Sequence, residues 1–249
     1  MGDAPAVEVK PWDAFLPWFG SVWKPGEHVA IVAPTGAGKS TFAVGILSHC
    51  RNYVLGFDPK GGDTTLRGSG WPRLPDWPPP PAVYKAMDEG RPQKFIVGPE
   101  VRIRDDIARQ RGVFAKALEG VFDDGGWTVY VDELQLMADR RMLGMGAQVE
   151  ALLIAARDKQ LSVVTAYQRP ANVPRTASDQ ATWVAVSFTR DRDVVDRVAE
   201  MLGRPKPEIR GALNGLDPYT WVVVGRDPRM PMVVTRPREI KRSRADASG

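Results

Sequence analysis

The chain has 249 residues, 43% of them hydrophobic, which suits one α/β domain with small additions. Its formal net charge of +4 permits a nucleic-acid partner without requiring one. Cys50 is the single cysteine, which excludes an intramolecular disulfide. Because the sequence shows neither an apolar run of membrane-spanning length nor a secretion signal, we expect a cytoplasmic protein without membrane insertion.

The first segment, residues 1–24, is rich in aromatic side chains between residues 11 and 23. Pro17 lies in the middle of this stretch and predicts that no long helix runs through it. Two interpretations remain open: the segment packs on the edge of the domain, or it offers a docking surface to a neighbouring subunit or another partner.

Strand-like and helix-like segments alternate along residues 25–235, which we expect to form one domain. The predicted strands lie within 27–33, 52–63, 93–99, 127–137, 161–170 and 182–188, and the predicted helices within 39–50, 104–126, 145–160 and 193–203. This alternation predicts an α/β fold with a central, mostly parallel β-sheet and helices on both faces. We expect a C-terminal β-hairpin at 218–235, and then a basic, mobile tail at 236–249.

Residues 70–92 interrupt this alternation and are rich in proline, with consecutive prolines from 78 to 81. Such a run favours polyproline II, so we expect a stiff surface loop. A ligand for a proline-reading module is the alternative.

The stretch IVAPTGAGKS, residues 31–40, places a glycine-rich turn between a predicted strand and a predicted helix. Glycines let backbone N–H groups turn toward a phosphate, and the helix N-terminus favours an anion. We therefore predict a P-loop, in which Lys39 reaches the β- and γ-phosphates and the Ser40 hydroxyl binds Mg²⁺. Ala33 stands where the motif usually has its first glycine. The predicted nucleotide-binding residues are Pro34, Thr35, Gly36, Ala37, Gly38, Lys39, Ser40 and Thr41.

A second motif, VYVDE at 129–133, ends an apolar strand in two carboxylates. In P-loop enzymes the first acid at this place holds magnesium, which we assign to Asp132. The second, Glu133, can orient and deprotonate the attacking water. A solvated acidic pair at a strand end would be the simpler interpretation without the P-loop. An adjacent glutamate also disfavours a small-molecule kinase.

A polar side chain on a neighbouring strand can report the state of the γ-phosphate. The stretch VVTAYQRP ends in Gln168, whose amide can donate to phosphate and accept from water. We predict that Gln168 senses the γ-phosphate, with a strand-capping glutamine as the alternative.

Several stretches taken in order resemble the FtsK/HerA group of P-loop motors. They are FDPKGGD at 57–63, VYVDE at 129–133, AARDKQLSVVTAYQRP at 155–170 and ANVP at 171–174. In this chain two residues separate Thr165 from Gln168, where relatives often have the threonine and glutamine adjacent. The resemblance covers roughly residues 25–225. It implies a RecA-like ATPase of the ASCE type that binds ATP and Mg²⁺, assembles as a homo-oligomeric, commonly hexameric, ring and pulls double-stranded DNA through the pore.

The resemblance also implies that Arg157 is offered to the γ-phosphate of the neighbouring subunit. Such a cation stabilises the charge of the transition state and links hydrolysis to the interface. Arg169 and Arg175 are alternatives for this role, and Arg157 beside Asp158 can equally be an ordinary arginine at a helix end.

The size of the chain resembles that of viral DNA-packaging ATPases and transfer ATPases of mobile elements. This implies a bacterial cell or a phage-infected host, with a viral portal or other docking protein as a partner. The candidate DNA contacts are Lys60 and Arg67, the loop 140–146 with Arg140 and Arg141, and the basic tail. The alternative function is a nucleotide-switched assembly or scaffolding ATPase that acts on a protein and moves no DNA.

Overall fold

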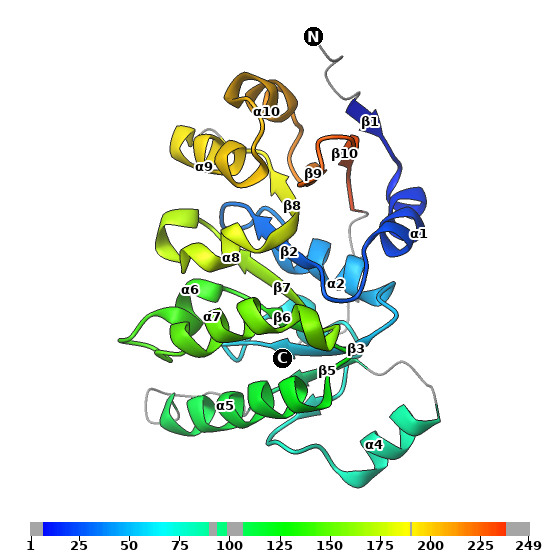
Figure 1. Cartoon of the computed structure of the whole chain (residues 1–249), viewed down its shortest axis with the longest axis vertical. Coiled ribbons are helices and arrows are strands. Elements are labelled where there is room, and N and C mark those ends of the chain that lie inside the picture. The colour runs from blue at the N-terminus through cyan, green and yellow to red at the C-terminus, as the bar shows by residue number, and fades with distance from the viewer. Residues whose placement is uncertain (1–6, 90–93, 99–106, 190, 238–249) are drawn as a thin grey trace, which may run out of the picture.

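The computed structural model describes residues 7–89, 94–98, 107–189 and 191–237, and its centre is a ten-stranded sheet (Figure 1). The strand order is β1-β10-β9-β8-β2-β7-β6-β3-β5-β4. Neighbouring strands are parallel except at β9, which is antiparallel to both β8 and β10. The strands are β1 (Val7–Val9), β2 (His28–Val32), β3 (Tyr53–Phe57), β4 (Arg73–Leu74), β5 (Lys94–Val97), β6 (Trp127–Val131), β7 (Ser162–Tyr167), β8 (Ala181–Ser187), β9 (Trp221–Gly225) and β10 (Met232–Thr235).

Helices cover both faces of this sheet, as the alternation of strands and helices predicts (Figure 1). On one face lie α1 (Trp12–Val22) and α2 (Lys39–Ser48), and on the other lie α5 (Ile107–Asp124), α7 (Gly146–Ala155) and α9 (Arg192–Leu202). The shorter elements are α3 (Thr64–Arg67), α4 (Pro81–Asp88), α6 (Leu134–Ala138), α8 (Arg175–Asp179), α10 (Lys206–Leu213) and the 3₁₀ turns η2 (Arg157–Lys159) and η3 (Pro170–Asn172).

The hydrophobic core is divided in two by the sheet, because successive side chains of a strand point to opposite faces. In β2, Val29 and Ile31 belong to the cluster beneath α1 and α2. Ala30 and Val32 belong to the cluster beneath α5, α7 and α9. Both sets are buried, which explains why the strand reads as a continuous apolar run in the sequence.

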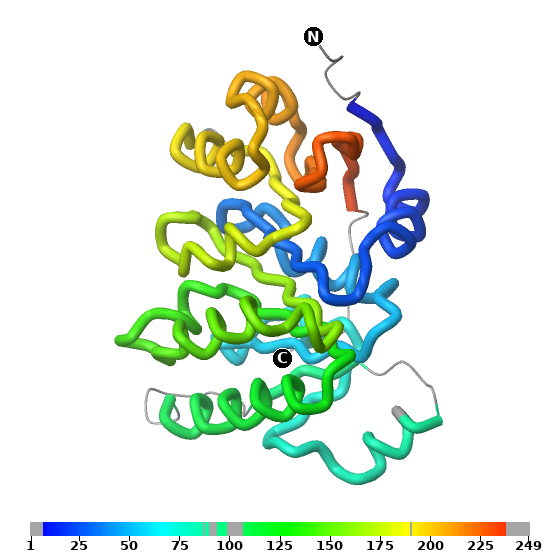
Figure 2. Tube along the Cα trace, viewed as in Figure 1, coloured from blue at the N-terminus to red at the C-terminus, as the bar shows by residue number. Residues whose placement is uncertain are grey.

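Two segments far apart in the sequence, one near each end of the described chain, pair in this sheet. β1 pairs in parallel with β10, and β10 forms the predicted C-terminal hairpin with β9. Figure 2 shows the N-terminal segment running beside this hairpin. The segment 1–24 is therefore partly built into the domain, while the predicted tail lies outside the described residues from 238 onward.

The prediction that Pro17 prevents a helix is wrong, because α1 is an 11-residue helix with Pro17 inside it. An internal proline costs about 3 kcal/mol. Burying a large apolar side chain contributes about 1.5–3 kcal/mol, and Phe15, Leu16 and Phe19 are all buried on one side of this helix. Packing therefore outweighs the local penalty. The same burial withdraws these side chains from any docking surface.

The proline-rich segment is more structured than a stiff surface loop. It contributes the short strand β4, and α4 begins at Pro81, where a proline has no N–H that the helix would need. Trp77 is buried, with its ring edge-on to Trp127 at 5.9 Å between centroids. Gly120 of α5 leaves the space that the Trp77 ring fills.

In the described parts of the chain, none of the helices combines the length and the apolar character that crossing a bilayer requires.

Candidate nucleotide-binding site

The parallel strands β2, β3, β6 and β7 end at one edge of the sheet, and the loops that follow them form the site. After β2, residues 33–38 make a turn in which Gly36 and Gly38 have φ of 78° and 85°. Side chains disfavour this left-handed region, so the turn requires glycine at both places. Gly38 is followed at once by α2, whose N-terminal N–H groups favour an anion. The predicted strand, loop and helix of a P-loop are all present.

Lys39 is buried and folds back across its own loop. Its Nζ donates to the carbonyl oxygens of Ala33 at 3.1 Å and Pro34 at 3.2 Å. Burial lowers the pKa of this amine, and the nearby carboxylates of Glu133 and Asp132 oppose that effect. The ammonium group is thus held at the mouth of the loop, where it can exchange carbonyl partners for phosphate oxygens.

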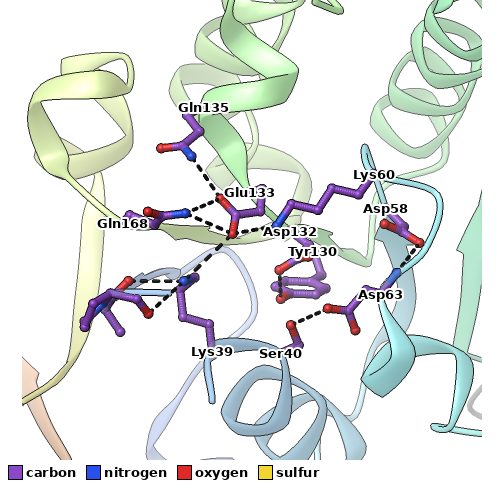
Figure 3. Close-up of polar contacts among 12 residues, drawn as sticks. Lys39, Ser40, Asp58, Lys60, Asp63, Tyr130, Asp132, Glu133, Gln135 and Gln168 are labelled. Atoms are coloured by element: carbon purple, nitrogen blue, oxygen red, sulfur yellow. Dashed lines mark hydrogen bonds and ion pairs between the residues drawn. The ribbon is translucent and has the colours of Figure 1, made fainter. Parts of the chain in front are cut away.

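Glu133 is the centre of the polar network in Figure 3. Its backbone has φ of 51°, a left-handed conformation that is rare for residues other than glycine and clusters at functional sites. Its Oε1 accepts from Lys60 Nζ at 3.0 Å, and its Oε2 accepts from Gln135 Nε2 at 3.1 Å. Lys39 Nζ lies 3.9 Å from Oε1. Glu133 is 3% exposed as a residue, and its carboxylate is surrounded by donors.

Gln168 follows the end of β7 and points at the same carboxylate (Figure 3). Its Nε2 donates to Oε2 of Glu133 at 3.3 Å. The amide thus stands beside the acid predicted to activate water. The structure brings Lys39, Glu133 and Gln168 together as the sequence predicts.

The predicted magnesium ligands Ser40 and Asp132 lie in an oxygen-rich corner that includes an acid the sequence analysis missed. Ser40 Oγ donates to Oδ2 of Asp63 at 2.8 Å, and Tyr130 Oη donates to Oδ1 of Asp132 at 2.8 Å. Burial raises the pKa of Asp132 to about 7, and the charge of Asp63 adds to this effect. A bound cation would favour the charged form of Asp132 and so oppose both effects on its pKa.

These residues fit Mg²⁺, which prefers oxygen ligands. Among the described residues, however, no three carboxylate, histidine or cysteine side chains are grouped closely enough to hold a metal by themselves.

Asp58 and Lys60 reach the site from the loop after β3. Asp58 is buried, and its Oδ2 accepts from the backbone N–H of Asp63 at 3.3 Å and from Arg73 at 3.3 Å. Lys60 was a candidate DNA contact, but its ammonium is bonded to Glu133. Arg67 donates to the carbonyl of Gly61. The contact between Lys60 and Glu133 depends on the adjacency of β3 and β6 in the sheet, which the sequence pattern does not encode.

Arg157 is not part of this cluster. It lies in η2, before the amino end of β7, and so at the opposite edge of the sheet from the P-loop. All three arginines are exposed. Arg169 and Arg175 also form ion pairs, with Asp191 and Asp179 respectively.

The loop that carries Arg157 is buttressed by buried groups. His28 Nε2 contacts the Leu153 carbonyl at 3.1 Å, and the backbone N–H of Val163 donates to His28 Nδ1 at 3.1 Å. Burial is the main cause that lowers the pKa of His28 to about 4, so the ring is neutral and donates through Nε2. His28 thereby ties the end of α7 to the start of β7, on either side of Arg157.

A groove of about 810 Å³ opens beside the site, between residues 135–147 and residues 171–174. Its lining includes Gln135, the cations Arg140 and Arg141, and the acids Asp139 and Glu150. Arg141 pairs with Asp139 at 3.0 Å, and its side chain is 89% exposed. Gln135 lines the groove and also donates to Glu133, so its side chain connects the groove to the candidate catalytic carboxylate.

No family model and no curated protein matches the sequence. Solved structures do resemble the fold. The genome packaging NTPase B204 from Sulfolobus turreted icosahedral virus 2, in complex with AMPPCP, has a TM-score of 0.59 at 14% identity, over 86% of this chain and 99% of that chain. VirB4 of Thermoanaerobacter pseudethanolicus has a TM-score of 0.60 at 13% identity, over 85% of this chain and 89% of that chain. The pCW3 conjugation coupling protein TcpA has a TM-score of 0.51 at 14% identity, and the match covers 84% of this chain and 59% of that chain.

The fold and the phosphate loop define this chain as a P-loop NTPase in architecture. The fold resembles those of the packaging NTPase B204 and of VirB4, in agreement with the P-loop architecture that the sequence motifs predict. The prediction of a mostly parallel sheet flanked by helices is likewise confirmed.

Proposed function

We propose that the chain is an ATPase that acts as a motor on double-stranded DNA, in a phage or mobile-element setting. The observation that carries this proposal is the buried Glu133, held by Lys60, Gln135 and Gln168 beside the P-loop lysine. A carboxylate in that place suits the activation of water rather than transfer to a substrate hydroxyl.

In this proposal each side chain has one task. Lys39 leaves the carbonyls of its own loop and binds the β- and γ-phosphates. Glu133 accepts a proton from the attacking water as the water bonds to the γ-phosphorus, and the bond to the β–γ bridging oxygen breaks, giving ADP and phosphate. Gln168 positions that water and the γ-phosphate. Ser40 and Asp132 would hold Mg²⁺, which when bound neutralises charge on the phosphates.

Arg157 completes the site in trans. At the sheet edge remote from its own P-loop, it cannot serve its own nucleotide, so it acts on that of an adjacent copy in a ring, which we propose is hexameric. Its exposure and the buttressing by His28 support this role.

The proposed DNA contact is the groove lined by Arg140 and Arg141. Arginines would bind backbone phosphates without reading sequence. Gln135 lies in the groove and bonds to Glu133, so DNA that displaces Gln135 would change the environment of the catalytic carboxylate. B204 is a DNA-packaging ATPase and TcpA is a conjugation coupling protein, and their similarity in fold supports a DNA substrate for this chain. A docking partner such as a viral portal belongs to the same setting.

The decisive experiment measures the ATPase rate with and without duplex DNA at rising salt. We expect stimulation by DNA that declines with salt, because phosphate contacts release counterions. The variant Arg140→Ala/Arg141→Ala should lose the stimulation and keep the basal rate. A rate that is indifferent to DNA would reject the motor and favour an assembly or scaffolding ATPase that acts on a protein.

A further inference from the structure

Tyr219 lies against the phosphate loop and has no part in the mechanism above. Its Cδ1 is 3.5 Å from the place where a β-carbon on Gly38 would stand. Its side chain is half exposed, at 48% for the residue. Its φ is 65°, a left-handed conformation that residues other than glycine rarely adopt and that marks functional sites more often than others.

The segment around Tyr219 is fixed to the helix that follows the P-loop. Trp221 is fully buried and stacks on Phe42 of α2, with ring centroids 4.5 Å apart. Ser187 Oγ donates to the carbonyl of Thr220 at 3.2 Å, and the N–H of Thr220 donates to the carbonyl of Asp217 at 3.1 Å. The backbone next to Tyr219 is therefore fixed beside the P-loop helix.

The strand order places this ring on a particular side of the P-loop. The groups that would meet the γ-phosphate come from β6 and β7, on one side of β2. On the other side of β2 lies β8, which is parallel to β2 and ends at Ser187. Ser187 pairs with Trp221, where the antiparallel strand β9 begins. Tyr219, just before β9, therefore lies at the same edge of the sheet as the P-loop. A triphosphate with its γ end toward β6 and β7 directs its nucleoside toward β8, β9 and Tyr219.

We propose that Tyr219 is the stacking platform for the base of the bound nucleotide. This inference rests on the proposed nucleotide binding but not on the proposed action on DNA. An aromatic ring offers a base its π-face and no edge-specific hydrogen bonds, so the platform accepts either purine. We therefore expect ATP and GTP to bind with affinities within about tenfold of each other, because every base has a π-face.

The test compares ligands that share the phosphates but differ in the base. Calorimetry in the presence of Mg²⁺ measures binding of ATP, GTP and inorganic tripolyphosphate to the full chain. We expect Tyr219→Ala to weaken ATP and GTP by about 5- to 150-fold, the range of aromatic–base stacking, and to leave tripolyphosphate unchanged. Tyr219→Phe should bind ATP like the wild type, because it keeps the ring.

Matched variants make the result interpretable. Tyr84→Ala removes a tyrosine from α4 and should change nothing. Lys39→Ala should weaken all three ligands. Tyr219→Gly tolerates the positive φ and replaces the alanine variant if that one does not fold.

Two outcomes would overturn the platform. Unchanged ATP affinity in Tyr219→Ala means that the ring does not meet the base, and an equal loss for ATP and tripolyphosphate means that Tyr219 only shapes the loop. A wild-type chain that binds none of the three ligands would reject nucleotide binding itself, and so the proposed ATPase with it. Binding of ATP without any stimulation by DNA would leave the platform intact and reject only the motor.

Discussion

The ammonium group of Lys60 lies 3.0 Å from Oε1 of Glu133, although 73 positions separate the two residues in the sequence. Lys60 is 48% exposed at its side chain, and Glu133 is 5% exposed. Burial lowers the pKa of Lys60, but its hydrogen bond and charge contact with Glu133 outweigh burial, so the net pKa is raised. The carboxylate that we propose as the base is thus restrained by a partner that solvent can reach.

Removing that restraint should raise the basal ATPase rate. In Lys60→Ala, Glu133 loses one of the donors that hold its carboxylate in place. We therefore expect the rate without DNA to rise about two- to fivefold, which corresponds to the free energy of a partly exposed ion pair. Steady-state phosphate release measures it, with Lys116→Ala on the exposed face of α5 as the control. A fall to the level of Lys39→Ala would show instead that Lys60 binds phosphate.

Neutralising Glu133 should separate binding from turnover. Glu133→Gln keeps the shape of the side chain but cannot accept the proton of the attacking water, so we expect hydrolysis to fall about 10²–10⁴-fold while ATP stays bound. Filter binding and single-turnover quenching measure the two effects. Glu119→Gln, on the exposed side of α5, is the matched control. Hydrolysis at the wild-type rate would remove Glu133 from the mechanism.

Replacing Arg157 should abolish turnover and spare nucleotide affinity, because this side chain lies at the sheet edge remote from its own P-loop. Mixing Arg157→Ala with Glu133→Gln subunits should restore part of the activity, since some sites then combine an intact glutamate with an intact neighbouring arginine. Arg169→Ala and Arg175→Ala test the alternatives. Mixtures as inactive as their components would contradict a shared site.

Asp132 should make stability depend on pH in the absence of Mg²⁺ and nucleotide. Its pKa is about 7 in the folded chain, mainly because of burial, against 3.8 as the ordinary value. Between these values the folded state retains a proton that the unfolded state has released, so the free energy of unfolding falls as pH rises from about 4 to 7. This fall in the free energy of unfolding is on the order of a few kcal/mol, and we expect Asp132→Asn to abolish it. Urea titrations across this range measure it, and parallel curves for both proteins would contradict the assignment.

His28 should act in the opposite direction. Burial lowers its pKa from 6.5 to about 4, so the unfolded state binds the extra proton between these values. Stability is therefore lost as pH falls from about 6.5 to 4. His28→Gln should flatten this acid limb, whereas His49→Gln, at an exposed histidine, should not. An acid limb that His28→Gln leaves unchanged would show that the ring is not held neutral in the fold.

Elements whose causes are local could be predicted from the amino-acid sequence alone. Apolar runs of strand length mark β2, β6 and β7. The glycines of the P-loop report the positive φ that the turn needs, and the acids at 132 and 133 follow a strand whose direction places them at the phosphate edge. Lys39, Glu133 and Gln168 could therefore be assigned to one site before the structure was known.

Long-range packing of the strands and helices determines which loops come into contact. It also determines where tertiary packing outweighs a local preference of the sequence. Lys60 reaches Glu133 because β3 lies beside β6, and Tyr219 reaches Gly38 because β9 lies beside β8 and β8 beside β2. Pro17 stays within a helix because burial of its neighbours exceeds the cost of one lost hydrogen bond. Periodicity specifies which face of a strand is buried, but not which strand is its neighbour, since that depends on the summed packing of the whole core.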